Sequence, residues 1–360
     1  MTDAALAGLQ QAIRRAAAAG TPLVVRGGGT KAFYGQATSG DLLDTRPCAG
    51  IVDYDPTELV ITARAGTPLA EVESALAGSG QMLACEPPHF GEGATLGGMV
   101  SAGLSGPRRP YGGAVRDLVL GVRMLDGTGE DLAFGGRVMK NVAGFDVARL
   151  MTGALGTLGV LTEVSLRCLP LPKAETTRVV ECTADDAIRM TNEWGARPIP
   201  LSATCHHAGL LAVRLSGALP AVEAAAKKIG GSELDGGDAF WRSLREQTHP
   251  YFAPSRDGGA PLWRLSVKST TPHADLGGVP LVEWGGALRW IVGGPDVDAV
   301  RIRAWAQSSG GHATLFRAGD DRSAGVFHPL PEALYALHRR LKATFDPSGI
   351  LNRGRMYADF

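Results

Sequence analysis

The chain has 360 residues, of which 44% are apolar and 20% are charged, and its 36 Lys and Arg residues balance 36 Asp and Glu residues. This length allows two domains of ordinary size, and the composition is that of a globular protein. The zero net charge argues against a broad nucleic-acid or anionic-membrane footprint, so we expect no nucleic-acid partner.

The cysteines and the N-terminal residues indicate in which cellular compartment the protein is located. No C-x-x-C pair occurs among the five cysteines, which argues against a structural zinc or iron–sulfur site and favours a reducing compartment. The first 20 residues lack a basic segment followed by an apolar one, and no apolar run reaches the roughly 18 residues of a membrane span. We expect a cytoplasmic protein without a metal site, which reaches the inner face of the cell membrane only through a complex.

The first half of the chain predicts short strands and helices. We expect an amphipathic helix over 3–19, followed by strands over 23–25, 41–43, 51–54 and 59–64. A helix over 69–76 follows, with Thr67 as its N-cap and Pro68 as its first residue.

Another set of elements completes this half. The segment 117–132 predicts a β-hairpin that turns at Asp126-Gly127. A short helix over 141–150 and a long strand over 158–172 come next, and the prolines at 170 and 172 mark a domain boundary.

The second half predicts an α+β sheet domain. We expect helices over 183–196 and 219–231, and strands over 210–217, 261–270 and 286–294. A final helix begins at residue 332 and is broken by Asp346-Pro347. The predicted domains are 1–172, 173–330, and a C-terminal helix and tail over 331–360 that returns to the first domain.

Glycine is about twice as frequent as the usual ~7%, with 49 residues. Many glycines fall in three loops, over 26–31, 89–113 and 151–160. Successive N–H groups without Cβ atoms can form an anion nest, and Gly28 is expected to leave space for the anion. The first loop alone fits an ordinary tight turn equally well. Three such loops beside strands indicate one long ligand with two phosphates and a flat ring, the alternative being loops that only join twisted strands.

The order of these loops resembles a known flavoprotein superfamily. The segments "VRGGGT", "GATLGGMVSAGLSGPRRPYGG" and "MTGALGTLGVLTEVSLRCLP" are similar to the PCMH-type FAD-binding domain of the vanillyl-alcohol oxidase and p-cresol methylhydroxylase superfamily. The tail "FDPSGILNRGRMY" is similar to the superfamily's C-terminal signature, and "GHATLFRAGD" and "LHRRLKATFDPSGILNRGRM" resemble the E-subunit family of bacterial glycolate oxidase. The implied fold is α+β, with a two-subdomain FAD-binding domain and a smaller α+β cap domain.

The resemblance also implies the residues that bind FAD. The first loop would wrap the pyrophosphate, the second loop would pack on the flavin and phosphates, the third would follow the adenosine half, and the tail would approach the flavin edge. In that order these residues are Arg26, Gly27, Gly28, Gly29, Thr30 and Lys31; Thr95, Gly97, Gly98, Ser101, Gly103 and Ser105, with Tyr111 and Gly112 at the border; Gly156, Gly159 and Val160; and Asn352 and Arg355.

Two departures from the superfamily affect the cofactor. The first loop carries no histidine for a covalent flavin bond, so the resemblance implies non-covalent FAD. Leu155 stands where many relatives have an acidic residue, which removes one polar contact.

The substrate site is less evident in the sequence. The metal-binding H-x-G-D-G-N-x-H motif of related D-2-hydroxy-acid enzymes is absent, and His206-His207 lacks its glycines and acidic partner. Arg264 and Arg289 are candidate binders of a substrate carboxylate. The alternative is that each arginine lies on the solvent face of a half-buried strand or pairs with a carboxylate of the protein, and His312 and Arg317 are open to the same alternative.

The resemblance implies a subunit of a glycolate-oxidising complex. Its partners would be a homologous larger FAD subunit and an iron–sulfur subunit that receives the electrons. Its substrate would be a small 2-hydroxy acid, and the reaction would be the oxidation of glycolate to glyoxylate. A non-catalytic FAD-binding assembly subunit is the first alternative. A stand-alone FAD-dependent alcohol oxidoreductase is the second.

Overall fold

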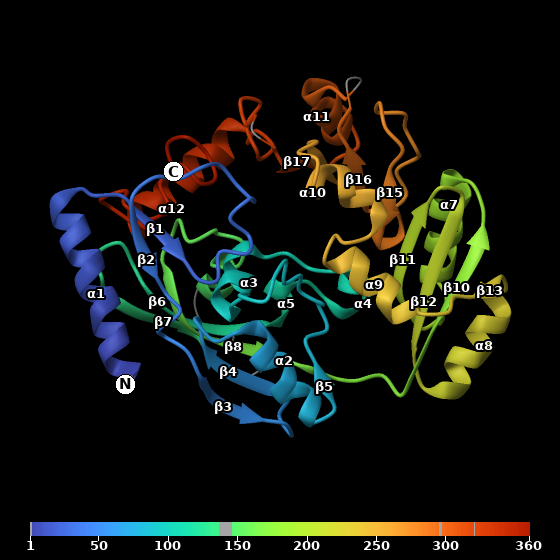
Figure 1. Cartoon of the computed structure of the whole chain (residues 1–360), viewed down its shortest axis with the longest axis horizontal. Coiled ribbons are helices and arrows are strands. Elements are labelled where there is room, and N and C mark those ends of the chain that lie inside the picture. Colours follow the sequence, from blue (N-terminus) through green and yellow to red (C-terminus); the bar gives the residue numbers. More distant parts are fainter. Residues whose placement is uncertain (1, 137–145, 295–296, 320) are drawn as a thin grey trace. The chain divides into compact units, whose positions relative to one another are not determined.

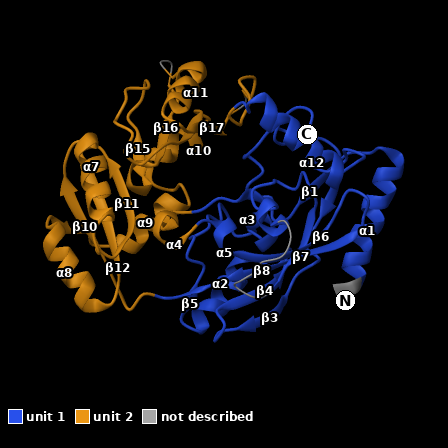
Figure 2. Ribbon diagram, turned by 180° about the vertical axis from the view of Figure 1, so that it is seen from behind, with its two compact units in different colours: residues 1–105, 114–171, 329–360 blue, residues 106–113, 172–328 orange. Residues whose placement is uncertain are grey.

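The computed structural model describes residues 2–136, 146–294, 297–319 and 321–360. The chain forms two compact units (Figures 1 and 2). The first contains residues 1–105, 114–171 and 329–360, and the second contains 106–113 and 172–328. Both combine helices with mainly antiparallel sheets, so the expected α+β class is confirmed.

An antiparallel five-stranded sheet forms the centre of the first unit. Its strands, in spatial order, are β3 (Ile51–Asp55), β4 (Val60–Arg64), β8 (Val160–Arg167), β6 (Val119–Leu125) and β7 (Asp131–Gly135). Helices α2 (Leu69–Gly78), α3 (Leu96–Ala102), α5 (Val115–Leu118) and α6 (Val147–Leu150) contribute buried side chains to its core. The predicted hairpin is present as β6–β7, whereas residues 141–145 of the expected short helix lie outside the described part.

A smaller layer completes the first unit. Helix α1 (Thr2–Ala19) packs Leu9 and Ile13 against the parallel pair β1 (Leu23–Arg26) and β2 (Asp41–Asp44). Helix α12 (Glu332–Phe345) precedes a tail that runs beside β1, where the N–H of Leu23 donates to the carbonyl of Ile350 (2.7 Å). Strands β5 (Gln81–Met82) and β9 (Leu169–Pro170) form a separate short pair.

The expected cap of helix α2 is wrong. Pro68, not Thr67, occupies the N-cap position, and the Thr67 side chain makes no cap bond. The Thr67 hydroxyl instead accepts from the N–H of Gly50 (2.9 Å) and lies 3.2 Å from its carbonyl. Thr67 therefore holds the backbone of Gly50, the residue immediately before β3, in place.

The second unit is built on an eight-stranded sheet. Its spatial order is β13 (Ser232–Glu233), β10 (Ala174–Glu181), β12 (Leu210–Gly217), β11 (Leu201–His207), β15 (Leu281–Glu283), β16 (Leu288–Val292), β14 (Leu262–Ser266) and β17 (His312–Arg317). Helices α7 (Ala184–Gly195) and α8 (Leu219–Ile229) pack on one half, and α11 (Ala299–Ser308) packs on the other. The remaining helices are α9 (Gly237–Arg245), the 3-10 turns η1 (Pro250–Phe252) and η2 (Trp284–Gly286), and α10 (Ala253–Arg256).

Residues 106–113, with the short helix α4 (Arg109–Gly112), belong to the second unit rather than to the expected first domain. The indole N–H of Trp284 donates to the carbonyl of Gly106 (3.1 Å). Arg108 donates to Glu175 (2.6 Å) at the start of β10. These contacts attach a segment from the middle of the glycine-rich stretch to the other sheet.

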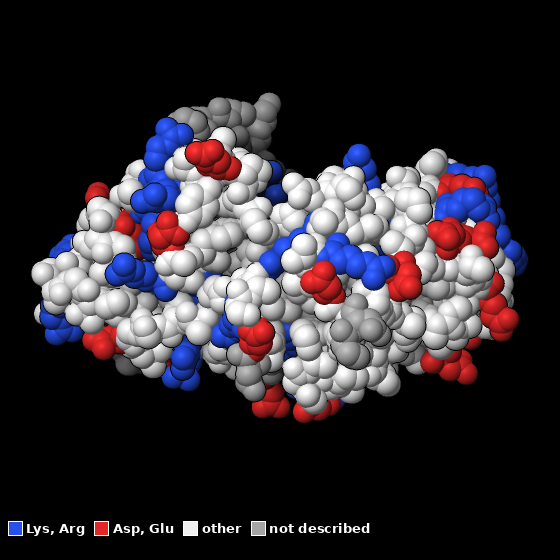
Figure 3. Space-filling view, turned by 90° about the horizontal axis from the view of Figure 1, so that it is seen from above, with Lys and Arg blue, Asp and Glu red and all other residues white. Residues whose placement is uncertain are grey.

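Acidic and basic side chains are interspersed over the face that Figure 3 shows. This agrees with the zero net charge of the chain. Among the described residues, no helix is both long enough and apolar enough to cross a membrane.

Candidate functional site

The first glycine loop leaves β1 with a row of backbone donors. Within the described part of the chain, the structure gives no hydrogen-bond partner to the N–H groups of Gly27, Gly28, Gly29 and Thr30. Gly29 has φ of +73°, a conformation that favours glycine. The ammonium of Lys31 lies 3.2 Å from the carbonyl of His89 and 3.4 Å from the Thr30 hydroxyl. Such a row of donors is suited to an anion.

The missing Cβ atoms of this loop serve a different purpose from the one expected. A Cβ on Gly28 would lie 1.4 Å from the carbonyl oxygen of Gly93, and one on Gly27 would lie 2.3 Å from the Thr95 hydroxyl. The space at these Cα atoms is therefore filled by the second loop, and the prediction that Gly28 leaves it open for an anion is wrong. The first and second loops are therefore in contact at these Cα atoms. The backbone N–H groups of the first loop are the part of it that remains for an anion.

The second loop uses its own N–H groups internally. Thr95 caps α3 by accepting from Gly98 (3.2 Å), as an N-cap threonine does. The N–H of Leu96 donates to Thr67 (2.9 Å), and that of Gly97 to Ala65 (2.7 Å). A Cβ on Gly97 would meet that of Ala65 at 2.7 Å. Thr95, Gly97 and Gly98 thus seat the helix instead of offering its first N–H groups to a phosphate.

The third loop is bonded to the end of α3. The N–H of Gly153 donates to Val100 (3.0 Å), and that of Leu155 donates to the carbonyl of Ser101 (2.9 Å). Gly103 ends the helix with φ of +64°, and a Cβ there would lie 3.0 Å from the backbone of Gly153. Ser105 accepts from Val115 (3.1 Å) at the start of α5.

The last two glycines of the third loop have packing roles. A Cβ on Gly156 would lie 2.8 Å from the Asn352 amide, and one on Gly159 would lie 2.1 Å from the end of Met124. Val160 is fully buried and begins β8, where it pairs with Leu125 of β6.

The tail holds these loops in place. The carboxamide oxygen of Asn352 accepts from the N–H of Val25 (2.8 Å), and its nitrogen donates to the carbonyl of Leu155 (2.7 Å). Arg355 donates to carbonyl groups of the segment after the first loop, those of Lys31, Ala32, Tyr34 and Gln36. Both tail residues therefore bind loop backbone, whereas the resemblance to the superfamily implies a place at the flavin edge.

A buried ion pair supports the same junction, and the sequence analysis missed it. The ammonium of Lys342 donates to Asp346 (2.7 Å) and to the carbonyls of Thr157 (2.8 Å) and Leu351 (2.7 Å). Burial lowers the pKa of Lys342, and its contact with Asp346 opposes that shift. The available signal was the i, i+4 spacing of Lys342, in the last turn of α12, and Asp346, at its C-cap and immediately before Pro347.

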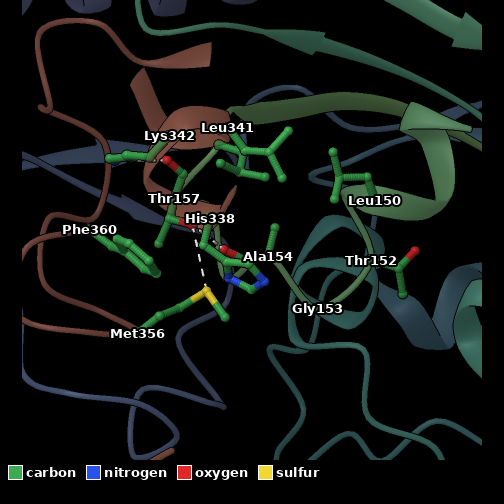
Figure 4. A pocket seen from close by; sticks show the side chains of 11 residues that line it. Leu150, Thr152, Gly153, Ala154, Thr157, His338, Leu341, Lys342, Met356 and Phe360 are labelled. Atoms are coloured by element: carbon green, nitrogen blue, oxygen red, sulfur yellow. Dashed lines mark hydrogen bonds between the residues drawn. The ribbon is translucent and has the colours of Figure 1, made fainter. Parts of the chain in front are cut away.

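A cavity of about 190 Å³ opens between the third loop and the C-terminal segment. Figure 4 shows side chains of both segments around it. The lining is mostly apolar and comprises Leu150, Thr152, Gly153, Ala154, Thr157, Leu158, His338, Leu341, Lys342, Met356 and Phe360. The Thr152 hydroxyl is buried and has no hydrogen-bond partner among the described residues.

The other candidates lie in the second unit. Tyr111 and Gly112 are in α4, so the structure groups them with the second sheet. Arg289 is 2% exposed and donates to the carbonyls of Gly286, Thr271 and Pro272. These bonds occupy its guanidinium, so we exclude Arg289 as a carboxylate binder.

His206 and His207 are adjacent residues of strand β11, and their side chains have different surroundings. His206 is buried and its Nε2 lies 3.0 Å from the carbonyl of Cys182, whereas His207 contacts the rings of His249 and Tyr251. Within the described residues, no group of three metal-ligating side chains is present.

Comparisons with known proteins identify the family. The family described as "FAD binding domain" matches residues 5–135, and "FAD linked oxidases, C-terminal domain" matches 321–356. Glycolate oxidase subunit GlcE of Escherichia coli K12 is 48% identical over 351 residues, which are 98% of this chain and 97% of that protein. The chain belongs to the GlcE family of FAD-binding oxidoreductase subunits.

More distant relatives share only part of the chain. Glycolate oxidase subunit GlcD of Bacillus subtilis is 30% identical over 47% of this chain and 36% of its own. The mitochondrial D-lactate dehydrogenase [cytochrome] 1 of Saccharomyces cerevisiae is 32% identical over 36% of this chain and 22% of its own. The solved structure of an alkyldihydroxyacetonephosphate synthase has the same fold, with a TM-score of 0.65, 15% identity, and coverage of 96% of this chain and 74% of that one.

FAD is the cofactor of this family, and the residues of the GlcE-family chain fit it. Donors in the first loop are available for a pyrophosphate, because Gly27 to Thr30 have no described N–H partner. The buried hydroxyl of Thr152 has no hydrogen-bond partner within the described ranges, and the adjoining apolar cavity has the capacity for one flat ring system.

Proposed function

We propose that this chain is the FAD-binding subunit of a glycolate oxidase complex, and that it contributes to the oxidation of glycolate to glyoxylate. The observation that carries the proposal is the 48% identity to E. coli GlcE across nearly the full length of both chains. The bonded arrangement of the three loops and the tail supports it independently, because such an arrangement preorganises a dinucleotide site.

The residues of the first loop bind the pyrophosphate in this proposal. The N–H groups of Gly27, Gly28, Gly29 and Thr30 donate to its oxygens, and Arg26 and Lys31 supply positive charge. The loop has no histidine, so FAD is held without a covalent bond. Bound FAD supplies the acceptor for the two electrons that leave the C–H bond of the 2-hydroxy acid.

We assign the cavity beside the third loop to the adenosine end of FAD. Its apolar lining suits a flat base, and the Thr152 hydroxyl is a buried group that a ligand atom would satisfy. Gly156, Gly159 and the backbone of Val160 lie along the same segment. The Ser101 carbonyl and Gly103, at the end of α3, contact this segment, and Ser105 accepts from Val115.

Partners complete the electron path. The curated names of the E. coli and B. subtilis relatives describe subunits, and we propose a larger homologous FAD subunit as one partner. We assign the iron–sulfur clusters to another partner, because the five cysteines of this chain are widely spaced in sequence. The five free thiols favour the reducing cytoplasm, with membrane contact only through the complex.

The test compares this chain alone with the assembled complex. The chain is co-expressed with its GlcD-type and iron–sulfur partners, purified, and examined by visible spectroscopy before and after anaerobic glycolate. We expect a yellow chain with about one releasable FAD, and glycolate-dependent bleaching in the complex. A colourless chain that FAD does not reconstitute contradicts the flavin role. A complex that bleaches equally when this chain cannot bind FAD shows a purely structural subunit.

A further inference from the structure

A cavity of about 410 Å³ lies in the second unit, beside the turn between β11 and β12. The start of α7, the end of β11 and the segment before β15 contribute its walls. Its apolar walls include Ala184, Val279 and Pro280, and its polar side chains are those of His206, His273 and Asp275. The residues that the family resemblance assigns to FAD do not line it, so the proposed flavin site leaves this cavity unexplained.

His206 supplies a buried acceptor to the cavity. Its side chain is directly opposite Leu211, whose core includes Ala187 of α7, so it points to the helix-covered face of the sheet. The residue is 6% exposed, and its Nε2 lies 3.0 Å from the carbonyl of Cys182. A carbonyl only accepts, so Nε2 carries the proton and Nδ1 carries the lone pair. Among the described residues, Nδ1 has no hydrogen-bond partner, which leaves it for a ligand with a donor.

The carboxylates around the cavity give it a negative charge. Asp275 accepts from the N–H of Gly277 (3.0 Å), and Asp185 accepts from that of His273 (2.9 Å). Within the described ranges no ion pair joins either carboxylate to a basic side chain. Arg301 reaches the same segment, but it donates to the backbone carbonyl of Asp275 (2.7 Å) rather than to the carboxylate. The cavity therefore suits a cation.

The rim of the cavity is apolar and exposed. Val279, on one wall, is 67% exposed, and Leu210, which follows the lining residue Gly209, is 47% exposed. Apolar side chains that surround polar groups in this way mark a surface for another protein. Lysine matches the interior, because its ammonium has three donors and no acceptor, while its methylene stem packs on apolar walls.

We propose that this cavity receives a lysine side chain from a basic segment of a partner subunit. The Asp275 carboxylate and Nδ1 of His206 accept from the ammonium, and the walls at Ala184, Val279 and Pro280 contact the stem. The presence of a partner subunit rests on the proposed function, whereas the acceptors and the charge belong to this chain.

A lysine analogue tests the cavity directly. N-acetyl-lysine methylamide is titrated into the FAD-loaded full chain, and the isotope-labelled imidazole nitrogens are followed by NMR. We expect the Nδ1 resonance of His206, assigned by its loss in His206→Gln, to shift. The norleucine analogue, which has the stem without the ammonium, should leave this resonance unchanged. Asp275→Asn should weaken binding of the lysine analogue about threefold, and its side-chain oxygen still accepts from Gly277, so the fold is retained.

Assembly tests the docking role in the complex. The dissociation constant of the full chain from its co-purified GlcD-type and iron–sulfur partners is measured by interferometry. Asp275→Lys should raise this constant at least about tenfold, because it places a cation against the incoming cation. Asp238→Lys, at an exposed position of α9, is the matched control and should assemble like the parent.

Two outcomes overturn the inference. One is a His206 resonance that does not respond to the lysine analogue. The other is parental assembly of Asp275→Lys, and glycolate-dependent bleaching of that complex would leave the proposed function intact. A complex that depends on Asp275 for assembly but does not bleach with glycolate contradicts the proposed function and supports the docking site.

Discussion

Asn352 donates to the carbonyl of Leu155, 197 residues earlier in the chain, while its oxygen accepts from the N–H of Val25. One carboxamide thus joins β1, which leads into the first glycine loop, to the third loop. Asn352 is 6% exposed, so both bonds are shielded from water. The loops keep their spacing because this side chain fits between them.

Asn352→Ala should loosen both loops together. Two buried backbone groups lose their partners, which costs about 2–4 kcal/mol of unfolding free energy. We expect a lower midpoint in urea unfolding and an FAD dissociation constant raised at least about tenfold. FAD release is followed by its fluorescence. Arg353→Ala, at the exposed neighbouring position, is the control, and equal FAD affinity in the two variants would contradict the role of Asn352.

Lys342→Met should be more damaging than a surface change on the same helix. Removing the ammonium leaves Asp346 buried without its cation and two carbonyls without a donor. Breaking a buried pair in this way costs about 3–5 kcal/mol. Arg340→Met on the exposed side of α12 should stay within about 0.5 kcal/mol of the parent. Urea unfolding of both variants checks the difference, and similar midpoints would refute it.

Gly28→Ala tests the contact between the first two loops. A Cβ would overlap the Gly93 carbonyl oxygen at 1.4 Å, so one loop must move. We expect loss of most bound FAD and a lower melting temperature, measured on the same preparations. Gly8→Ala in α1 meets no atom within 4 Å and should stabilise the chain by up to about 1 kcal/mol. Full FAD content in Gly28→Ala would show that the loops need not touch.

Much of the fold could be predicted from the sequence, because hydrophobic periodicity and turn residues are local signals. The strand at Leu262–Ser266, the helix at Glu332–Phe345 and the hairpin after Val119 follow from them. The glycine loops and their order also identified the family. The role of Gly28 could not be predicted, because it depends on Gly93, which is 65 residues away. The stacking of Arg109 and Arg264 on Trp284 likewise depends on a segment joining another sheet.

His206 should make the chain sensitive to mild acid. Burial lowers its pKa, and the nearby His207 and His273 lower it further, although its bond to Cys182 opposes the shift. Below the unfolded value of about 6.5 the unfolded chain takes up the proton first, so stability falls as the pH decreases toward the folded pKa. His206→Gln should flatten part of the decline in urea midpoint between about pH 7.5 and 5.5. An unchanged pH profile would show that His206 is not buried neutral.

Filling the cavity beside the third loop should separate FAD from FMN. Leu341 lines this cavity, whereas Leu337 on the same helix is 42% exposed. If the cavity receives the adenosine end, Leu341→Trp should raise the dissociation constant of FAD at least about tenfold and leave that of FMN unchanged, because FMN has no adenosine. Leu337→Trp introduces the same side chain outside the cavity and should bind both flavins like the parent. Fluorescence titration of the flavin-free chain provides the four constants. Equal weakening of FAD and FMN by Leu341→Trp would place the effect on the shared flavin half, and unaltered FAD binding would exclude the cavity from the cofactor site.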